Sequence, residues 1–170
     1  FTSQKLARRR KYTILGARTS RPLSTMKQKL IAIALALCVA VTAQAQLKLN
    51  KGDHIAILGS TTAERMQHSA WFDTLIHAAN QDKDIVMRNI AFAADEVGTW
   101  HRVDEFGSRD EWLGRVQASV ILAFYGFNES FKGEAGVADF KAKLEEFIKH
   151  TKESTYSKSG PTRLVLISPI

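Results

Sequence analysis

Hydroxyl, amide and carboxyl side chains follow the ends of apolar runs at several places in this sequence. Ser60 and Thr61 come directly after one such run, Asp95 follows a second, and Asn128 follows a third. A hydroxyl can act as a nucleophile when a base removes its proton. Amide and carboxyl groups can hold polar ligands through hydrogen bonds. Polar side chains at successive run ends therefore indicate a ligand-binding or catalytic site.

Four apolar runs predict the strands that would position these side chains. They span residues 54–59, 85–90, 119–125 and 163–168. Helical patterns lie between them, over residues 62–80, 108–116 and 134–153, and the second begins with the Ser-x-x-Glu spacing of a capping box. Alternation of helices with nearly continuous apolar strands predicts a parallel sheet covered on both faces. We expect a three-layer, doubly wound α/β fold of the flavodoxin-like type, truncated at the C-terminus because such a sheet normally continues beyond a fourth strand.

The first 45 residues do not fit that domain. Residues 1–25 are basic without any acid, and the chain begins with Phe1, which is typical of translation from upstream of the true start. Residues 26–45 have the order of a signal peptide: a positive start, a 14-residue apolar run over 30–43, and a small-x-small site. That run is shorter than the roughly 20 residues of a transmembrane helix. We expect export to the periplasm or medium after cleavage near Ala45-Gln46, and no membrane span in the mature form.

This division changes the meaning of the charge. The formal net charge is +7, but residues 46–170 hold 15 basic and 17 acidic residues, a net of −2. A nucleic-acid partner is therefore not expected, because its site needs clustered Lys and Arg. The single cysteine, Cys38, lies in the leader, so the mature domain has no disulfide. Neither a cofactor nor a metal is expected, since no phosphate loop and no convergent ligand set is visible.

Three motifs resemble the conserved blocks of the SGNH (GDSL-type) hydrolase family in order and spacing. They are Ile57-Leu-Gly-Ser-Thr61, Arg88-Asn89 leading to Ala94-Asp95, and Gly126-Phe-Asn-Glu129. Residues 64–67, 126–131 and 166–169 are also similar to a GDSL-like module of large exported bacterial proteins. The resemblance implies an SGNH-like domain over residues 46–170. It implies an activity on ester bonds, with a small-molecule, lipid or carbohydrate ester as substrate.

The resemblance assigns roles to the motif residues. In the family, a Ser two residues after the first Gly attacks the ester carbonyl, and Thr61 stands at that position. Ser60 stands at the family's Asp position. It can act as the nucleophile only if the turn is shifted by one residue relative to the family. Asn128, in the motif that Gly126 begins, and the backbone N–H of Ala94 match the oxyanion hole, which stabilises the charge on the carbonyl oxygen. Ala94 replaces a Gly, which a backbone donor tolerates if its φ is negative.

Other interpretations of the hydroxyls and acids stay open. Ser60 and Thr61 could instead cap the following helix, as their residue types favour, and neither would then be a nucleophile. Asp95 and Glu96 are adjacent in one loop and do not fit the separation of about 5–10 Å between glycosidase carboxylates. Trp100 is the candidate for a sugar platform, whereas Trp71 and Trp112 are predicted to lie in the core.

The base that a hydroxyl nucleophile needs has no match in this chain. The family supplies Asp and His three residues apart, and nothing after Asn128 has that form. His101 is a weak candidate for a substitute base or metal ligand, and His150 is predicted to be solvated. We therefore expect the Asp and the His beyond residue 170 and no triad-dependent turnover from residues 1–170 alone. The alternative function is a non-catalytic carbohydrate- or ligand-binding module of a larger exported protein.

Overall fold

The computed structural model describes residues 47–168, which belong to one compact unit that begins at Gln46. The predicted signal peptide, the segment upstream of it and Pro169-Ile170 lie outside the described residues. Within the described part, no helix is long and apolar enough to cross a membrane.

The predicted parallel sheet is confirmed. Four parallel strands pair in the order β2-β1-β3-β4. Their bounds are β1 His54–Gly59, β2 Val86–Asn89, β3 Val120–Phe124 and β4 Arg163–Leu166, each inside or equal to a predicted run. Because β2 lies on one side of β1 and β3 on the other, the direction of winding reverses between β1 and β3. A reversal of this kind opens a crevice at the carboxyl ends of the strands.

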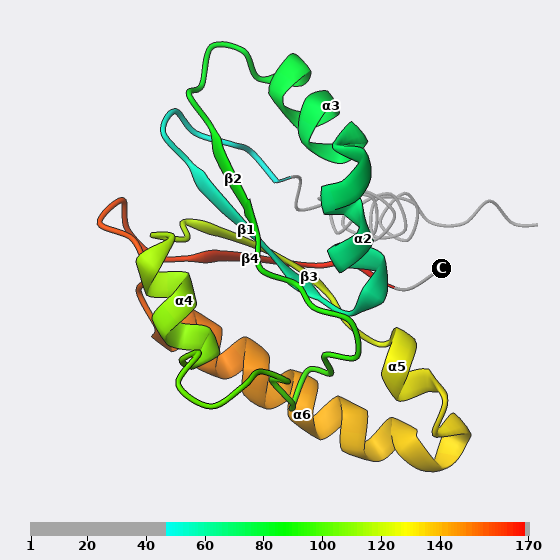
Figure 1. Cartoon of the computed structure of the whole chain (residues 1–170). Helices are drawn as coiled ribbons and strands as arrows, with labels where there is room; N and C mark the ends of the chain where they lie inside the picture. Colours follow the sequence, from blue (N-terminus) through cyan, green and yellow to red (C-terminus); the bar gives the residue numbers. More distant parts are fainter. Residues whose placement is uncertain (1–46, 169–170) are drawn as a thin grey trace, which may run out of the picture. The chain divides into compact units, whose positions relative to one another are not determined.

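Helices cover both faces of this sheet, as the three-layer prediction requires (Figure 1). The helices are α2 Thr61–Ser69, α3 Trp71–Ala79, α4 Arg109–Arg115, α5 Phe127–Ser130 and α6 Gly133–Glu153. α2 and α3 lie on one face, and α4 and α6 on the other. Alternate residues of the strands supply the two cores: Ile55 and Ile57 face α2 and α3, whereas Ala56 and Leu58 face α4 and α6.

The prediction of one helix over residues 62–80 is wrong. Ala70 adopts a left-handed conformation with φ of 54°, which ends α2 and begins α3 in a new direction. A left-handed alanine costs about 1–2 kcal/mol, and packing of Phe72 and Ile76 against the sheet offsets it. The turn leaves Trp71 72% exposed, so its assignment to the core is also wrong. The helical spacing of apolar residues continues across the break, which hides it in the sequence.

A buried carboxylate joins three strands at the amino end of the sheet. Asp53, just before β1, accepts hydrogen bonds from the Ser119 hydroxyl at 2.9 Å, the Asn50 N–H at 2.6 Å and the Arg163 guanidinium. Burial alone would raise the pKa of Asp53, but these hydrogen bonds outweigh it and lower the pKa. Since Ser119 precedes β3 and Arg163 begins β4, the carboxylate fixes the relative register of β1, β3 and β4.

Asp53→Asn is expected to lower the free energy of unfolding by about 2 kcal/mol, since charge-assisted hydrogen bonds of this kind contribute roughly 1.5–3 kcal/mol each. Urea unfolding at pH 7 measures the change. The exposed Asp82→Asn is the control and should stay within about 0.5 kcal/mol of wild type.

The pH dependence of stability tests whether the charge of the Asp53 carboxylate causes this effect. A lowered pKa in the folded state means that the carboxylate stabilises above its unfolded pKa of about 3.9 and loses this effect as the pH falls through the folded value. The difference between wild type and Asp53→Asn should therefore shrink below about pH 4. A difference that stays constant from pH 7 to pH 3 would contradict this role.

Candidate functional site

The ends of β1 and β3 and the loop after β2 meet at the carboxyl edge of the sheet. The Phe92 N–H donates to the Gly59 carbonyl at 3.2 Å, and the Ser60 N–H donates to the Phe124 carbonyl at 3.3 Å. Gly59 has φ of 137°, and a Cβ built there would lie 2.3 Å from the Phe124 carbonyl oxygen. Only glycine fits this approach of the two strand ends, which sets Ser60 and Thr61 beside β3.

The two candidate nucleophiles have different surroundings. Ser60 is 1% exposed, and it occupies the N-cap position of α2 without a side-chain capping bond. Thr61 is the first residue of α2 and is half-buried. Its backbone N–H has no partner within the helix, as for any first-turn residue, whereas the N–H of Ser60 is engaged by Phe124. Thr61 thus offers both an accessible hydroxyl and a neighbouring backbone donor.

Asn128 and Ala94, the predicted oxyanion donors, lie close together. Asn128 is in the first turn of α5, and its side-chain amide donates to the Asp95 carbonyl at 3.5 Å. Gly126, at the N-cap of α5, has φ of 110°. The sequence prediction required a negative φ at Ala94, and this requirement is not met, because Ala94 has φ of 69°. A glycine at this position would adopt the conformation without strain.

Glu129 was missed in the sequence analysis and holds two of the loops together. It is 6% exposed. One carboxylate oxygen accepts from the Val97 N–H at 2.8 Å, and the other accepts from the Gly126 N–H at 2.9 Å. The first bond reaches the loop that carries Ala94, and the second is the Glu half of a capping box on α5, since Gly126 has no side chain to supply the other half. The signal in the sequence was its position three residues after Gly126, which is the spacing of a capping box.

A buried ion pair fixes the 91–107 loop and was also missed. The Arg102 guanidinium binds both oxygens of Asp95, at 2.8 and 3.0 Å, and donates to the Ile90 carbonyl at 3.0 Å. The guanidinium carbon lies 3.7 Å from the centroid of Trp100, which leaves that face of the indole covered rather than open to a sugar. The sequence did contain a signal for this packing of Arg102: several aromatic residues lie around one arginine between residues 92 and 106.

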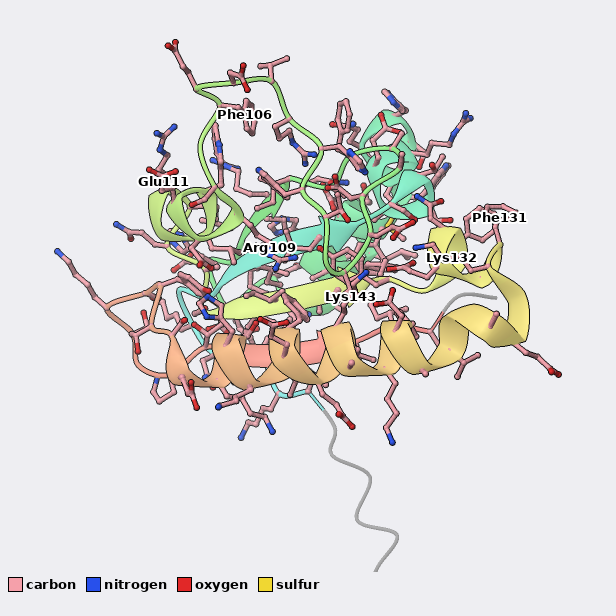
Figure 2. The ribbon with its side chains drawn as sticks, turned by 90° about the horizontal axis from the view of Figure 1, so that it is seen from below. Phe106, Arg109, Glu111, Phe131, Lys132 and Lys143 are labelled. Atoms are coloured by element: carbon pink, nitrogen blue, oxygen red, sulfur yellow. The ribbon has the colours of Figure 1, made fainter. Side chains whose placement is uncertain are left out.

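The acids of this loop do not form a catalytic pair. The side chain of Asp95 is fully buried against Arg102. Glu96 pairs with Lys132 at 3.0 Å, and this hydrogen bond raises the pKa of Lys132. Figure 2 shows Lys132 beside Phe131, at the end of the structure where α5 passes into α6. Both carboxylates therefore tie the loop to neighbouring elements.

The described histidines lie away from the candidate nucleophiles. The ring of His54 contacts the Val116 carbonyl at 2.9 Å, which confirms a structural role. His68 pairs with Glu64 at 3.3 Å, and His150 pairs with Asp110 at 2.7 Å on the surface. His101 is exposed and lines an open hollow with Phe92 and Val103. Within residues 47–168, no group of three or more His, Cys, Asp or Glu side chains could hold a metal ion.

A pocket of about 210 Å³ opens at the carboxyl ends of β1, β3 and β4, and Thr61 is not among the residues that line it. The hydroxyl residues Ser60 and Thr62 line one part of it, and apolar side chains line most of the rest. Tyr125 also lines it, and burial raises the pKa of its phenol, so Tyr125 stays neutral near pH 7. The pocket therefore combines a hydroxyl-bearing end with an uncharged wall.

One solved structure to which this chain is similar is the crystal structure of the psychrotrophic esterase EstA from Pseudoalteromonas sp., inhibited by monoethylphosphonate. The sequences are 20% identical, the TM-score is 0.49, and the match covers 69% of this chain. It covers 61% of that chain, which is less than two thirds of its length. No family model and no curated protein matches the sequence. The likeness is one of fold, a parallel sheet flanked by helices.

Ala94→Gly is expected to leave the free energy of unfolding unchanged or to raise it by up to about 1 kcal/mol. It relieves roughly 1–2 kcal/mol of left-handed strain but increases the freedom of the unfolded chain. The matched control is Ala93→Gly, at an exposed neighbour without positive φ, which should destabilise by about 0.5–1 kcal/mol. Urea unfolding measures both, and equal losses in the two variants would contradict the left-handed backbone at Ala94.

Glu129→Gln is expected to destabilise the protein by about 1–3 kcal/mol, because an amide has one accepting oxygen for two N–H donors. Amide hydrogen exchange should become faster at Val97 or at Gly126, since local opening follows the lost bond. Glu145→Gln, in an exposed i,i+4 pair with Lys141, is the control and should change stability by less than about 0.5 kcal/mol. Unchanged protection at both amides would contradict the bridging role.

Proposed function

We propose that this domain hydrolyses uncharged ester bonds by the mechanism of the SGNH family, with Thr61 as nucleophile. The observation that carries the proposal is the meeting of the three motifs. Hydrogen bonds join Gly59 to Phe92 and the side chain of Asn128 to Asp95. The hydroxyl of Thr61, the loop of Ala94 and the amide of Asn128 therefore share one edge of the sheet. These are the nucleophile and the oxyanion donors that acyl transfer needs around a carbonyl carbon, without its general base.

In this proposal Thr61 attacks the carbonyl carbon, and the oxyanion receives hydrogen bonds from the N–H of Thr61 and the side chain of Asn128. The N–H of Ala94 is retained as the third donor on the resemblance alone, because its φ of 69° departs from the negative φ that the sequence argument required. The position of Thr61 at the start of α2 adds the positive end of the helix dipole near the developing charge. Thr61 is favoured over Ser60 because it matches the family's nucleophile position and is the more exposed of the two residues. Ser60, and not Thr61, lines the pocket. Ser60 remains the alternative nucleophile.

A general base must accept the proton of the nucleophile. Within residues 47–168, no histidine lines the pocket. This observation also favours a second candidate function, a binding module that keeps the pocket and performs no chemistry. We further propose that residues 26–45 direct export, so that either function operates outside the cytoplasm.

The test is hydrolysis of p-nitrophenyl butyrate by the full gene product. Thr61→Ala is expected to abolish turnover, whereas Thr61→Ser retains it, because serine keeps the hydroxyl and lacks the methyl that crowds attack. Asn128→Ala should lower kcat by about 10²–10³-fold, the usual effect of removing one oxyanion donor.

Thr74→Ala, at an exposed position on α3, is the control and should leave kcat unchanged. Loss of activity in Ser60→Ala with retention in Thr61→Ala would transfer the nucleophile role to Ser60. Absence of turnover in the wild type would reject the esterase proposal and leave the binding module.

A further inference from the structure

The pocket that Ser60 and Thr62 line has an apolar wall, and the composition of this wall selects among esters. Met66 comes from α2, Phe124 from the end of β3, Phe127 from α5 and Ile167 from the segment after β4. Four apolar side chains from four elements thus enclose one space. Phe127 is 43% exposed and packs edge-on against Phe131 at 5.3 Å between ring centroids. It forms an aromatic rim at the surface.

No charged side chain lines this pocket among the described residues. Moving a carboxylate or an ammonium group into such a site without a partner costs several kcal/mol. Tyr125 stays neutral near pH 7 and supplies no counter-charge. A charged acyl or alcohol group is therefore disfavoured at this wall.

Hydroxyl residues line the pocket from the ends of two different strands, β1 and β4. The hydroxyl residues Ser60 and Thr62 flank Thr61 in the sequence, and Ser168 adds a third polar side chain to the lining. The hydroxyls around the rim of a sugar ring would lack partners along the apolar part of this lining. An ester has one polar carbonyl group and an apolar chain, so it needs few polar partners in a pocket whose lining is mostly apolar.

The size of the space sets the size of the apolar group. A cavity of roughly 150 Å³ lined by aliphatic and aromatic side chains is sufficient to bind benzene. At about 210 Å³, this pocket has room for more than the methyl of an acetyl group. No tryptophan lines the pocket: Trp100 is covered by Arg102, and Trp112 stacks on Phe106 at 4.8 Å.

From these features we infer that the pocket binds a hydrocarbon group of four to six carbons from an uncharged ester, with Met66, Phe124, Phe127 and Ile167 as its wall. The inference rests on the proposed function for the position of the ester carbonyl. It selects medium-chain acyl esters over acetylated carbohydrates.

A binding experiment without catalysis tests this inference. The protein contains three methionines, of which Met66 lines the pocket and Met87 lies in the core. With [¹³C]methyl-methionine, the two signals can be assigned through Met66→Leu and Met87→Leu and followed during titration with 2-octanone. This ketone has the shape of a medium-chain ester and cannot be hydrolysed. The Met66 signal is expected to shift saturably while the Met87 signal stays in place.

Three probes at the same concentration serve as controls: acetone, sodium hexanoate and methyl α-D-glucopyranoside. Each should shift the Met66 signal by less than about one tenth of the effect of 2-octanone. Ile167→Trp, which fills the pocket, should weaken 2-octanone binding at least about tenfold, whereas Leu75→Trp on the exposed face of α3 should not.

No shift at Met66, or an equal shift with the glucoside or hexanoate, would overturn the inference. The result is independent of turnover: saturable binding of 2-octanone together with absent esterase activity would reject the proposed function and retain the apolar ligand class. Hydrolysis of p-nitrophenyl acetate with no binding of 2-octanone would retain the proposed function and reject the apolar ligand class.

Discussion

The carboxylate of Glu129 is the interaction on which the arrangement of the site depends. It is buried between two loops that follow different strands, and each of its oxygens accepts one backbone N–H, from Val97 and from Gly126. A buried carboxylate with these bonds is stable only where both donors point at it. The bridge therefore fixes the loop of Ala94 relative to the first turn of α5, which carries Asn128. The distance between the candidate oxyanion donors therefore depends on the Glu129 bridge.

The rest of the carboxyl edge is held by contacts of the same kind. Arg102 pairs with the buried Asp95 inside the 91–107 loop, so an ion pair orders the loop together with the core residues Ala91 and Val97. Figure 2 shows Arg109 and Lys143 between this loop and α6. At the opposite edge of the sheet, Asp53 holds β1, β3 and β4 in register. Buried carboxylates thus position both ends of the strands, and the apolar clusters hold the layers between them.

The fold was predictable from the sequence because its signals are local and repeated. The four strands are short apolar runs, and the alternation of their residues between two cores follows from their period of two. The capping box at Ser108 was equally local and is confirmed. The break at Ala70 was not predictable, since an alanine in a left-handed turn leaves no trace in composition.

The site was predictable only in part. The motifs placed Thr61, Ala94 and Asn128 at the edge of the sheet, but the motifs alone do not give the backbone angle of Ala94 or the greater burial of Ser60. The roles of Glu129 and Arg102 depend on partners up to 32 residues away in the chain. Such pairings follow from the topology, and a single sequence does not record them.

The central claim is that a nucleophilic hydroxyl and the oxyanion donors meet at this edge. The most direct measurement is a crystal structure of the full gene product after reaction with diethyl p-nitrophenyl phosphate, whose phosphoryl group mimics a tetrahedral intermediate. We expect phosphorus bonded to the hydroxyl oxygen of Thr61. We also expect a phosphoryl oxygen within hydrogen-bond distance of the Thr61 N–H, the Ala94 N–H and the Asn128 amide. No adduct at Thr61 or Ser60, or an adduct whose phosphoryl oxygen points away from Asn128, would contradict the central claim.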